Sequence, residues 1–488
     1  MPNRVTRRRA AQRKTDGRAA ASHDSANPKA LIDFMMKSWQ APPVTPVARI
    51  EGHERFRQRR DKLSAAFAGE WLFIPAGHEK IRNQDNVYRF RPASDFYYLT
   101  GNVEADCVLV LAPKGKGHEH ILYVEPNPGR ASPTFFTDRS KGELWVGPRL
   151  GLPQSRERFA VDKTAAIGDL GKLALRLKAG RKTMRVLRGI DPILESLLPS
   201  KKNRDAELAV FLSEQRLVKD ESEVAALVKA AASTRRAYEA VIRDMRHAKS
   251  ERELEGTFDR QARIEGNDVG YGTIVAAGAH ACTLHWTRND GVLKAGDLLL
   301  VDAGIEGHQL YTADITRTVP VSGAFTAQQR EIYDLVIEAQ NAALAAVKPG
   351  NDYLAPHTAS IRVLTLGLER LGILPMPAEE ALKEENQFHK RYTLHNTSHM
   401  LGLDVHDCAS ARPENYRKGK LKPGQVLTVE PGLYFQPDDL TVPERYRGIG
   451  IRIEENVLVT ETGHRLLNDI PRTSRDVEQW IAGLWQRA

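Results

Sequence analysis

The sequence predicts a chain of two domains, in which a smaller α/β domain precedes an α+β domain. At 488 residues the chain is too long for one ordinary hydrophobic core. Short β-type runs alternate with helix-like stretches up to about residue 215, and long amphipathic helices separated by strand runs follow. We therefore divide the folded chain into residues 50–215 and residues 216–488.

The first 49 residues are predicted to be a basic, flexible arm. Residues 1–30 carry eight lysines and arginines but only two acidic residues, and they lack the apolar stretch of a secretory signal. Their Arg-rich, acid-poor composition weakly resembles an organelle transit peptide. Residues 29–39 are expected to form a short amphipathic helix, and residues 41–48 a Pro-rich, extended linker.

Charge and cysteine content exclude several classes of protein. The net charge is +9, but much of this excess lies in the arm, so the folded part gives no argument for nucleic-acid binding. Three cysteines, none in a CxxC pair, favour a reducing cytoplasm. The apolar runs are shorter than the roughly 18 residues of a membrane span, and no phosphate-binding glycine motif follows a strand. We expect a soluble cytoplasmic protein with no nucleic-acid or membrane partner.

The expected elements follow from periodicity and capping signals. In the first domain the strand-like runs are residues 70–77, 95–101, 106–113 and 120–126. In the second, three helices are expected: one from a capping box at Asp220 and Glu223, one from Ser250 to Gly266, and one after Thr326. Strand runs at 297–304, 313–321, 424–435 and 448–459 should form a curved antiparallel sheet under these helices.

Four acidic residues stand at positions where the pattern of the predicted strands indicates burial. Asp302 follows four apolar residues, and Glu430 ends the apolar run before Pro431. Strand alternation puts Asp314 on the face of Thr316 and Thr318, and it puts Glu454 on the face of Arg452. A buried charge is costly unless it is paired or binds a metal. Each acid alone has an ordinary explanation: Asp302 could cap a turn before Gly304, and Arg452 could be a simple ion-pair partner on the face of Glu454.

Three histidines crowd the segment 395–407, in a chain with 15 histidines. His395 and His399 are four residues apart, and His406 follows the turn at Gly402. The segment is not the HExxH helix of zinc peptidases, because Asn396 occupies the glutamate position. Beside four carboxylates, one of the three histidines is best explained as a metal ligand. An oxygen-rich site with one imidazole favours Mn²⁺, Co²⁺ or Fe²⁺, with Zn²⁺ as an alternative.

Five motifs in this order resemble one enzyme family. They are "VDAG", "YTADITRT", "TSHMLGLDVHD", "TVEPGLY" and "GIRIEENV". Together they resemble the dinuclear-metal pita-bread peptidases, which include methionine aminopeptidase, prolidase and aminopeptidase P. Residues 87–111 look like the N-terminal domain of aminopeptidase P. The resemblance spans nearly all of residues 50–470 and implies a pita-bread catalytic domain in residues 216–488.

The resemblance also implies the ligands of the metal ions. By position in the motifs they are Asp302, Asp314, His399, Glu430 and Glu454, with Asp314 and Glu454 bridging two divalent ions, first of all Mn²⁺. The spacing of 12 between Asp302 and Asp314 is about one residue longer than the family's usual spacing, a departure that concerns the intervening loop and not the ligands.

The implied reaction is release of the N-terminal residue from peptides with proline in second position. Two ions would share a water, lower its pKa and present hydroxide to the scissile carbonyl. Glu430 is the expected proton acceptor, His406 and His285 would polarise the carbonyl or hold the proline, and Arg452 would hold a ligand carboxylate. The expected substrate-binding residues are His285, His395, His406 and Tyr434.

Three alternatives stay open at this point. A prolidase, which cuts only Xaa-Pro dipeptides, shares the site motifs. A pita-bread module without metals would serve as a binding protein, although all five ligand positions are filled here. Cys408 beside His406 suggests a thiol nucleophile, but sequence neighbours rarely have the required geometry. We also expect a homo-oligomer, either a dimer or a tetramer.

Overall fold

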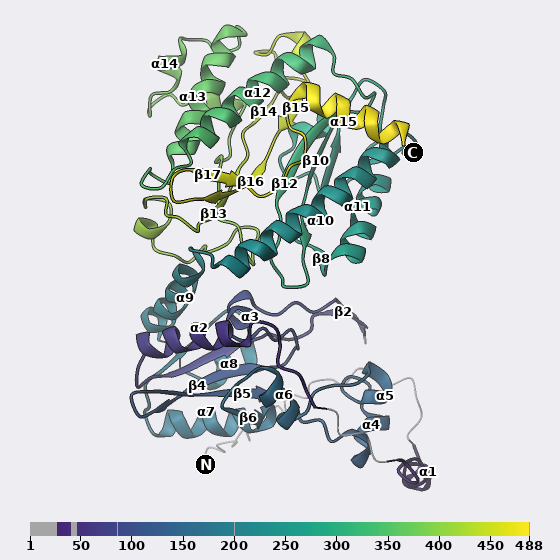
Figure 1. The fold of residues 1–488 in the computed structure, drawn as a ribbon, viewed down its shortest axis with the longest axis vertical. Helices are drawn as coiled ribbons and strands as arrows, with labels where there is room; N and C mark the ends of the chain where they lie inside the picture. Colours follow the sequence, from purple (N-terminus) through teal and green to yellow (C-terminus); the bar gives the residue numbers. More distant parts are fainter. Residues whose placement is uncertain (1–26, 41–45, 85, 200, 488) are drawn as a thin grey trace, which may run out of the picture. The chain divides into compact units, whose positions relative to one another are not determined.

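The computed structural model describes residues 27–40, 46–84, 86–199 and 201–487 (Figure 1). Two compact units divide between Asp205 and Ala206, whereas the sequence placed the division at 215/216. Helix α9 (Lys202–Arg216) contains this division, so the composition changes only after the helix has ended. Most of the predicted basic arm, at 1–26, and much of the predicted linker, at 41–45, lie outside the described residues.

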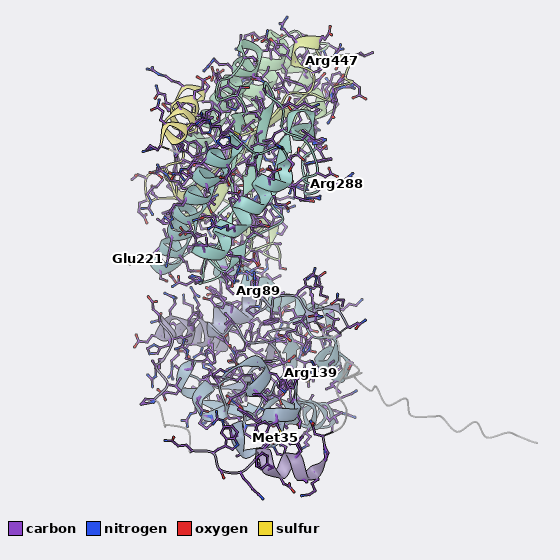
Figure 2. The ribbon with its side chains drawn as sticks, turned by 90° about the vertical axis from the view of Figure 1, so that its right-hand side faces the viewer. Met35, Arg89, Arg139, Glu221, Arg288 and Arg447 are labelled. Carbon is purple, nitrogen blue, oxygen red and sulfur yellow. The ribbon has the colours of Figure 1, made fainter. Side chains whose placement is uncertain are left out.

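The segment expected to form a short amphipathic helix contains α1 (Lys29–Met35), none of whose side chains is buried. Met35 at its end is labelled in Figure 2. Beyond the helix, the Trp39 ring lies 6.1 Å from that of Phe136, and the Arg130 guanidinium lies 4.2 Å from the Trp39 ring centre. The contact of this segment with its unit is therefore made by Trp39 rather than by a helix face.

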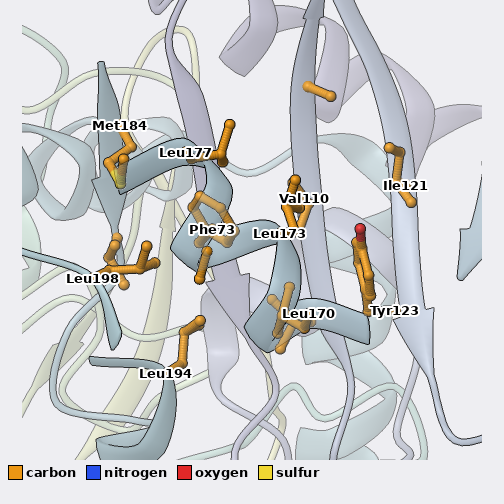
Figure 3. Close-up of a cluster of buried hydrophobic side chains, with 14 residues drawn as sticks. Phe73, Val110, Ile121, Tyr123, Leu170, Leu173, Leu177, Met184, Leu194 and Leu198 are labelled. Atoms are coloured by element: carbon orange, nitrogen blue, oxygen red, sulfur yellow. The ribbon is translucent and has the colours of Figure 1, made fainter. Parts of the chain in front are cut away.

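The first unit is built on a five-stranded mixed sheet in the order β6-β5-β4-β1-β7, where β1 is antiparallel to β4 and parallel to β7. Strand alternation directs Phe73 and Val110 to one face, where helix α7 packs with Leu173 (Figure 3). The opposite face carries His120, which accepts a hydrogen bond from Arg60 of helix α2. The elements of this unit are β1 (Trp71–Pro75), β2 (Ile81–Asn83), β3 (Asn86–Val87), β4 (Val108–Lys114), β5 (Gly117–Val124), β6 (Lys163–Ala166), β7 (Met184–Val186), α2 (His53–Ala66), α3 (Ser94–Thr100), α4 (Thr134–Thr137), α5 (Glu143–Val146), α6 (Leu152–Arg158), α7 (Leu170–Ala179) and α8 (Pro192–Leu197).

One expected strand of this unit is wrong, because residues 95–101 form helix α3. The aromatic run from Phe96 to Tyr98 has high strand propensity, but all of it is buried in the helix, so tertiary packing overrides the local preference. Gly101 ends the helix in the left-handed region, with a φ of 67° that glycine adopts without strain.

Helices of the second unit begin where capping signals predict them. Asp220 forms a capping box with Glu223 at the start of α10, Ser250 caps α11, and Thr326 forms a capping box at the start of α12. The helices are α10 (Glu221–Met245), α11 (Glu251–Glu265), α12 (Ala327–Ala346), α13 (Ala355–Arg370), α14 (Ala378–Ala381) and α15 (Ser474–Gln486). In the described part of the chain, none of the helices is both long and apolar enough to cross a bilayer.

Strands of the second unit pair in antiparallel fashion, as the sequence predicts. Helices lie across them: Tyr238 of α10 donates a hydrogen bond to the carbonyl of Val301, and Gln340 of α12 donates to that of Ile453 (Figure 1). The amide of Glu454 donates to the carbonyl of Thr316 at 3.1 Å and so joins the central sheet to the later strands. The strands are β8 (Asp268–Val269), β9 (Ile274–Ala277), β10 (Leu298–Ala303), β11 (Ile305–Glu306), β12 (Ile315–Pro320), β13 (Val426–Val429), β14 (Gly432–Tyr434), β15 (Gly450–Arg452), β16 (Glu455–Val459) and β17 (His464–Leu466).

Candidate metal centre

Five side chains from separate segments of the second unit line one cavity of about 740 Å³. They are Asp302 on β10, Asp314 directly before β12, His399, Glu430 directly after β13, and Glu454 between β15 and β16. The structure therefore brings together all the residues that the sequence nominates as ligands. Further residues of the lining are Tyr271, His285, His395, His406, Asp407 and Arg452.

Sheet register explains why these acids converge. Asp302 pairs with Thr316 across β10 and β12, and Asp314 stands two residues before Thr316, on the same side of the strand. The backbone of Glu454 pairs with Thr316 from the other side, and the Thr316 hydroxyl donates to Glu454 Oε2 at 2.7 Å. Strand alternation and two pairings thus place three carboxylates around one threonine.

The closest group of candidate ligands is Asp314, His399 and Glu454, whose ligand atoms lie within 4.8 Å of one another. His399 Nε2 lies 3.2 Å from Asp314 Oδ2 and 3.4 Å from Glu430 Oε1. Among the described residues, no hydrogen-bond partner reaches the buried Oε1 of Glu454. An orphaned carboxylate oxygen beside an imidazole and two further acids fits a bound cation.

The remaining oxygens are held by donors from the chain. Tyr271 places its hydroxyl 2.8 Å from Asp302 Oδ1 and 2.6 Å from Asp314 Oδ1, so it bridges the two acids. Arg452 Nη2 donates to Asp302 Oδ2 at 2.6 Å. The arginine therefore pairs with Asp302, 150 residues away in sequence, rather than with its neighbour Glu454.

Electrostatics of the cluster show an excess of buried negative charge. Burial, together with the charges of Asp314 and Glu430, raises the pKa of Glu454 well above its usual range. Burial, opposed by His399 and reinforced by Asp314, raises the pKa of Glu430 to about 7. Burial also raises the pKa of Asp302, despite Arg452. Without a further cation, these carboxylates are driven toward their protonated forms.

His399 is the exception that fits a ligand. Burial lowers the pKa of His399, but its hydrogen bond to Asp314 and the charge of Glu430 outweigh this effect and raise it to about 9. Burial works against ionisation of Asp314 too, yet the hydrogen bond from His399 holds its pKa below the usual value. A divalent cation, when bound, would supply the positive charge that a protonated His399 supplies to these carboxylates in its absence.

Two of the other nominated residues form a chain along the cavity wall. His395 Nε2 lies 2.8 Å from the hydroxyl of Tyr434, which accepts a hydrogen bond from Arg452 Nη1 at 2.9 Å. Burial and the charge of Arg452 lower the pKa of His395 to about 3, so this imidazole is neutral at pH 7. Tyr434 is not part of the cavity lining itself, and it supports the wall through His395 and Arg452.

His285 and His406 both face the cavity. The rings of His406 and His399 stand perpendicular, with their centres 4.3 Å apart. Burial and the neighbouring His399 lower the pKa of His406, so it offers a neutral imidazole near the acids. His285 belongs to an irregular loop that follows β9, and both histidines are exposed enough to meet a ligand.

Sequence reasoning missed two residues that organise this site. Tyr271 lies between Gly270 and Gly272; a Cβ at Gly270 would stand 1.9 Å from the Thr312 hydroxyl, so the glycine permits the close approach of this segment. The Gly-Tyr-Gly pattern is the signal that was available. Lys219 was the second: its ammonium forms a buried ion pair of 2.9 Å with Asp407, next to His406.

Cys408 is not placed for catalysis. It is fully buried in the hydrophobic cluster around Met400 and Tyr416, and burial raises the pKa of its thiol well above the ordinary value. The cavity lining does not include it. A thiolate nucleophile at this position is therefore excluded.

Comparison with known proteins gives a consistent picture across the chain. Residues 225–461 match the model of metallopeptidase family M24, and residues 56–186 match the aminopeptidase P N-terminal domain. Xaa-Pro aminopeptidase 1 of Streptomyces coelicolor is 50% identical over 459 residues, which cover 93% of this chain and 92% of the relative. Xaa-Pro aminopeptidase of Escherichia coli is 36% identical over 431 residues, covering 85% and 94%.

Solved structures agree with these matches. Aminopeptidase P from E. coli with the inhibitor Pro-Leu superposes with a TM-score of 0.80 at 32% identity, and the match covers 90% of this chain and 100% of that one. The zinc-substituted E. coli enzyme in complex with product has a TM-score of 0.79 at 32% identity, covering 90% and 99%.

Proposed function

The chain belongs to metallopeptidase family M24 and carries the aminopeptidase P N-terminal domain, and from this premise we propose that it is an Xaa-Pro aminopeptidase. The predicted fold class, a pita-bread domain after a smaller α/β domain, is confirmed by the match to aminopeptidase P. One observation carries the activity: a relative with this name is 50% identical over nearly the whole of both chains. This supports an aminopeptidase over a prolidase or a binding module without metals.

The enzyme binds divalent metal, as family M24 and the zinc-substituted relative indicate. We propose two ions per chain, first of all Mn²⁺ with Co²⁺, Fe²⁺ or Zn²⁺ as alternatives, held by Asp302, Asp314, His399, Glu430 and Glu454. Four carboxylates and one imidazole suit these metals, and the orphaned Glu454 oxygen supports a cation at its side. When bound, such ions polarise a carbonyl and acidify a water at neutral pH.

The side chains of the protein would divide the remaining work. Glu430 faces both His399 and His395 from the cavity wall, a position from which it can accept a proton and pass it to the leaving nitrogen. His406 and His285 would hold the substrate carbonyl, because both imidazoles line the cavity and are exposed. Arg452 would keep Asp302 oriented through its 2.6 Å contact.

Specificity for proline has a physical basis in the substrate. The nitrogen of an Xaa-Pro bond carries no hydrogen, so peptidases that need this donor fail on it, and a site shaped for the ring can specialise. A prolidase must in addition neutralise the free carboxylate of that proline, which requires cationic groups at the end of its pocket.

The deciding experiment compares peptide lengths and the second residue. Xaa-Pro-Yaa tripeptides and longer peptides should be cleaved with release of the first residue only, and replacing proline by alanine should stop cleavage. The matched substrates are the Xaa-Pro dipeptides. Strong cleavage of dipeptides with none of tripeptides would make the protein a prolidase instead.

We also propose that the enzyme is a homo-oligomer of the cytoplasm. The three cysteines are buried and free, which suits a reducing compartment. Light scattering on the purified protein measures the subunit number, and cell fractionation measures the location. We propose that residues 50–215 are the aminopeptidase P-like domain and that residues 216–488 are the catalytic domain. Expressing each part alone tests this assignment.

A further inference from the structure

His285 is carried by a segment that has little regular structure of its own. His285 lies between β9 and β10, shortly after a 3₁₀ turn at Gly278–Cys282. We call residues 277–291, which begin with the last residue of β9, the His285 loop. Backbone bonds inside the loop are few, such as the 3.0 Å bond from the Thr287 amide to the His285 carbonyl. Contacts from elsewhere must therefore fix the loop. Asn289 ties the loop to β9, and Cys282 is bonded to the segment after β14.

Glu251, the first residue of helix α11, supplies four further contacts. Its side chain is fully buried, and each carboxylate oxygen accepts two hydrogen bonds from the loop. Oε1 accepts from the Ala277 amide at 2.7 Å and lies 2.8 Å from His280 Nδ1. Oε2 accepts from the Trp286 indole at 2.8 Å and from the Gly291 amide at 2.7 Å. One carboxylate thus holds both ends and the middle of the loop.

Because Trp286 is the next residue after His285, fixing the Trp286 side chain also restricts where the backbone of His285 can lie. The Trp286 ring stacks on that of His280 with centres 3.9 Å apart and planes at 23°. The ring also lies near Arg288, whose Cζ is 5.5 Å from the ring centre and whose side chain, labelled in Figure 2, is 73% exposed. The hydrogen bond from the indole nitrogen to Glu251 and the stack on His280 together hold the Trp286 ring in position.

The residue before His285 is also fixed. Arg452 Nη2 lies 3.4 Å from the carbonyl of Leu284, while the same guanidinium group holds Asp302. His285 therefore stands between Leu284, which meets the acid cluster through Arg452, and Trp286, which meets Glu251. The direction of the imidazole into the cavity depends on both anchors.

We infer that Glu251 is a positioning residue for the peptidase reaction, acting through the His285 loop and not on the substrate. Four donors on a buried carboxylate far exceed what a helix start needs, because α11 is already capped by Ser250. All four come from the loop that carries His285. This inference rests on the proposed function, since it assigns Glu251 a role in the reaction of the same site.

Glu251→Gln is the sharpest test, because it keeps the shape of the side chain and replaces one acceptor oxygen by an NH₂ group that faces two donors. With His285 present, the change should lower kcat/KM on an Xaa-Pro-Yaa tripeptide about 10- to 100-fold, with metal content unchanged. In a His285→Ala background the same change should lower it less than about threefold, since the residue being positioned is gone.

Glu253→Gln is the matched control, because it removes a charge from the same first turn of α11. Within the described part of the chain, the Glu253 carboxylate bonds to Ser250 and the Lys249 amide and to no residue of the His285 loop, so kcat/KM should stay at the wild-type value. If Glu251→Gln does not fold, Trp286→Phe takes its place, because it removes one donor to Glu251 and keeps the ring stack. Its effect on kcat/KM is then compared with and without His285 in the same way. Equal losses with and without His285 would show a general structural role and overturn the inference, as would wild-type activity of Glu251→Gln.

Failure of the underlying function is recognised separately. If the wild-type enzyme does not cleave the tripeptide at all, the proposed function is wrong. If it cleaves the tripeptide and His285→Ala is fully active, the function stands and the positioning role of Glu251 is overturned.

Discussion

Glu454 and Glu455 are neighbours on opposite sides of one backbone, and both are 1% exposed. Glu455 accepts hydrogen bonds from Arg317 and from Asn468, whose amide lies at 2.6 Å, and the Arg317 guanidinium further donates to backbone carbonyls. Glu454 accepts only from Thr316 among the described residues, and its second oxygen has no partner. We call these the ion-pair side and the cavity side.

The contrast separates a structural charge from one that awaits a ligand. On the ion-pair side, a buried carboxylate meets a buried guanidinium, so desolvation is offset within the protein. On the cavity side, four carboxylates share Arg452 and His399, so they are balanced either by taking up protons or by the divalent cations that we propose. Burial alone does not identify a functional acid; the balance of charge around it does.

Glu454→Gln tests the cavity side with the largest expected effect. Loss of this proposed ligand should lower kcat/KM by about 10³-fold or more, because metal centres supply several kcal/mol of transition-state stabilisation. Elemental analysis should show less bound metal, while urea unfolding of the metal-free protein should show equal or greater stability, since like charges are removed. Glu455→Gln is the matched variant and should keep its metal. Full metal content in Glu454→Gln would contradict the assignment.

Arg317→Met tests the ion-pair side. It leaves Glu455 buried without its cation, and breaking a buried pair in this way costs about 3–5 kcal/mol. Urea unfolding followed by circular dichroism measures the loss, and the double variant Arg317→Met with Glu455→Leu should recover most of it. A loss below about 1 kcal/mol would mean that the two sides do not differ as described.

Chelation compares the two sides without a mutation. Removing divalent metal should destabilise the wild-type protein by about 2.7 kcal/mol relative to metal at 100 times its dissociation constant. Differential scanning calorimetry measures the shift in Tm. The Glu454→Gln variant should shift far less, and Glu455→Gln should shift as the wild type does; an equal shift in all three proteins would argue against a ligand role for Glu454.

His120 extends the comparison to the first unit, where a buried histidine lies against Arg60. Burial and then the charge of Arg60 lower the pKa of His120 to about 4, below the value near 6.5 of an unfolded chain. The unfolded state therefore takes up the proton first, and stability falls as pH drops from about 6.5 to 4.

The expected loss at pH 4.5 relative to pH 7 is about 2 kcal/mol from this group. Urea unfolding of the first unit at both pH values measures it, and His120→Gln should reduce the loss by that amount. An unchanged slope in His120→Gln would show that the histidine is not buried in its neutral form.

Deletion of residues 1–40 should have the smallest effect. None of the site residues lies in this segment, and its described part contacts its unit only modestly, with Trp39 against Phe136. The value of kcat/KM should stay within about twofold, and Tm should fall slightly because this contact is lost. A large loss of activity or a change of subunit number would assign the arm a role in assembly.

How far the sequence predicted these features depended on how local their signals are. The helix starts at Asp220, Ser250 and Thr326 were predicted because a cap and its helix lie within four residues. The strand expected at residues 95–101 was wrong because strand propensity yielded to burial in a helix.

The site shows the same limit. Strand alternation placed Asp314, Thr316 and Thr318 on one side of the strand. It also placed Arg317 among apolar neighbours, because its partner Glu455 is 138 residues away and no local pattern reveals it. Tyr271 and Glu251 escaped notice for the same reason: their partners are far along the chain. The catalytic roles of the nominated residues stay predictions until the variants are measured.

The 150 residues that separate Asp302 from Arg452 also govern when the site comes into being. At synthesis rates of about 5–20 residues per second, the ribosome adds Asp302 roughly 8 to 30 seconds before Arg452. During that interval the early acids have neither their guanidinium nor the glutamates of the later strands. With the proposed ligands, the complete metal site would therefore form late in the life of the nascent polypeptide, after the slow closure of long-range strand pairs.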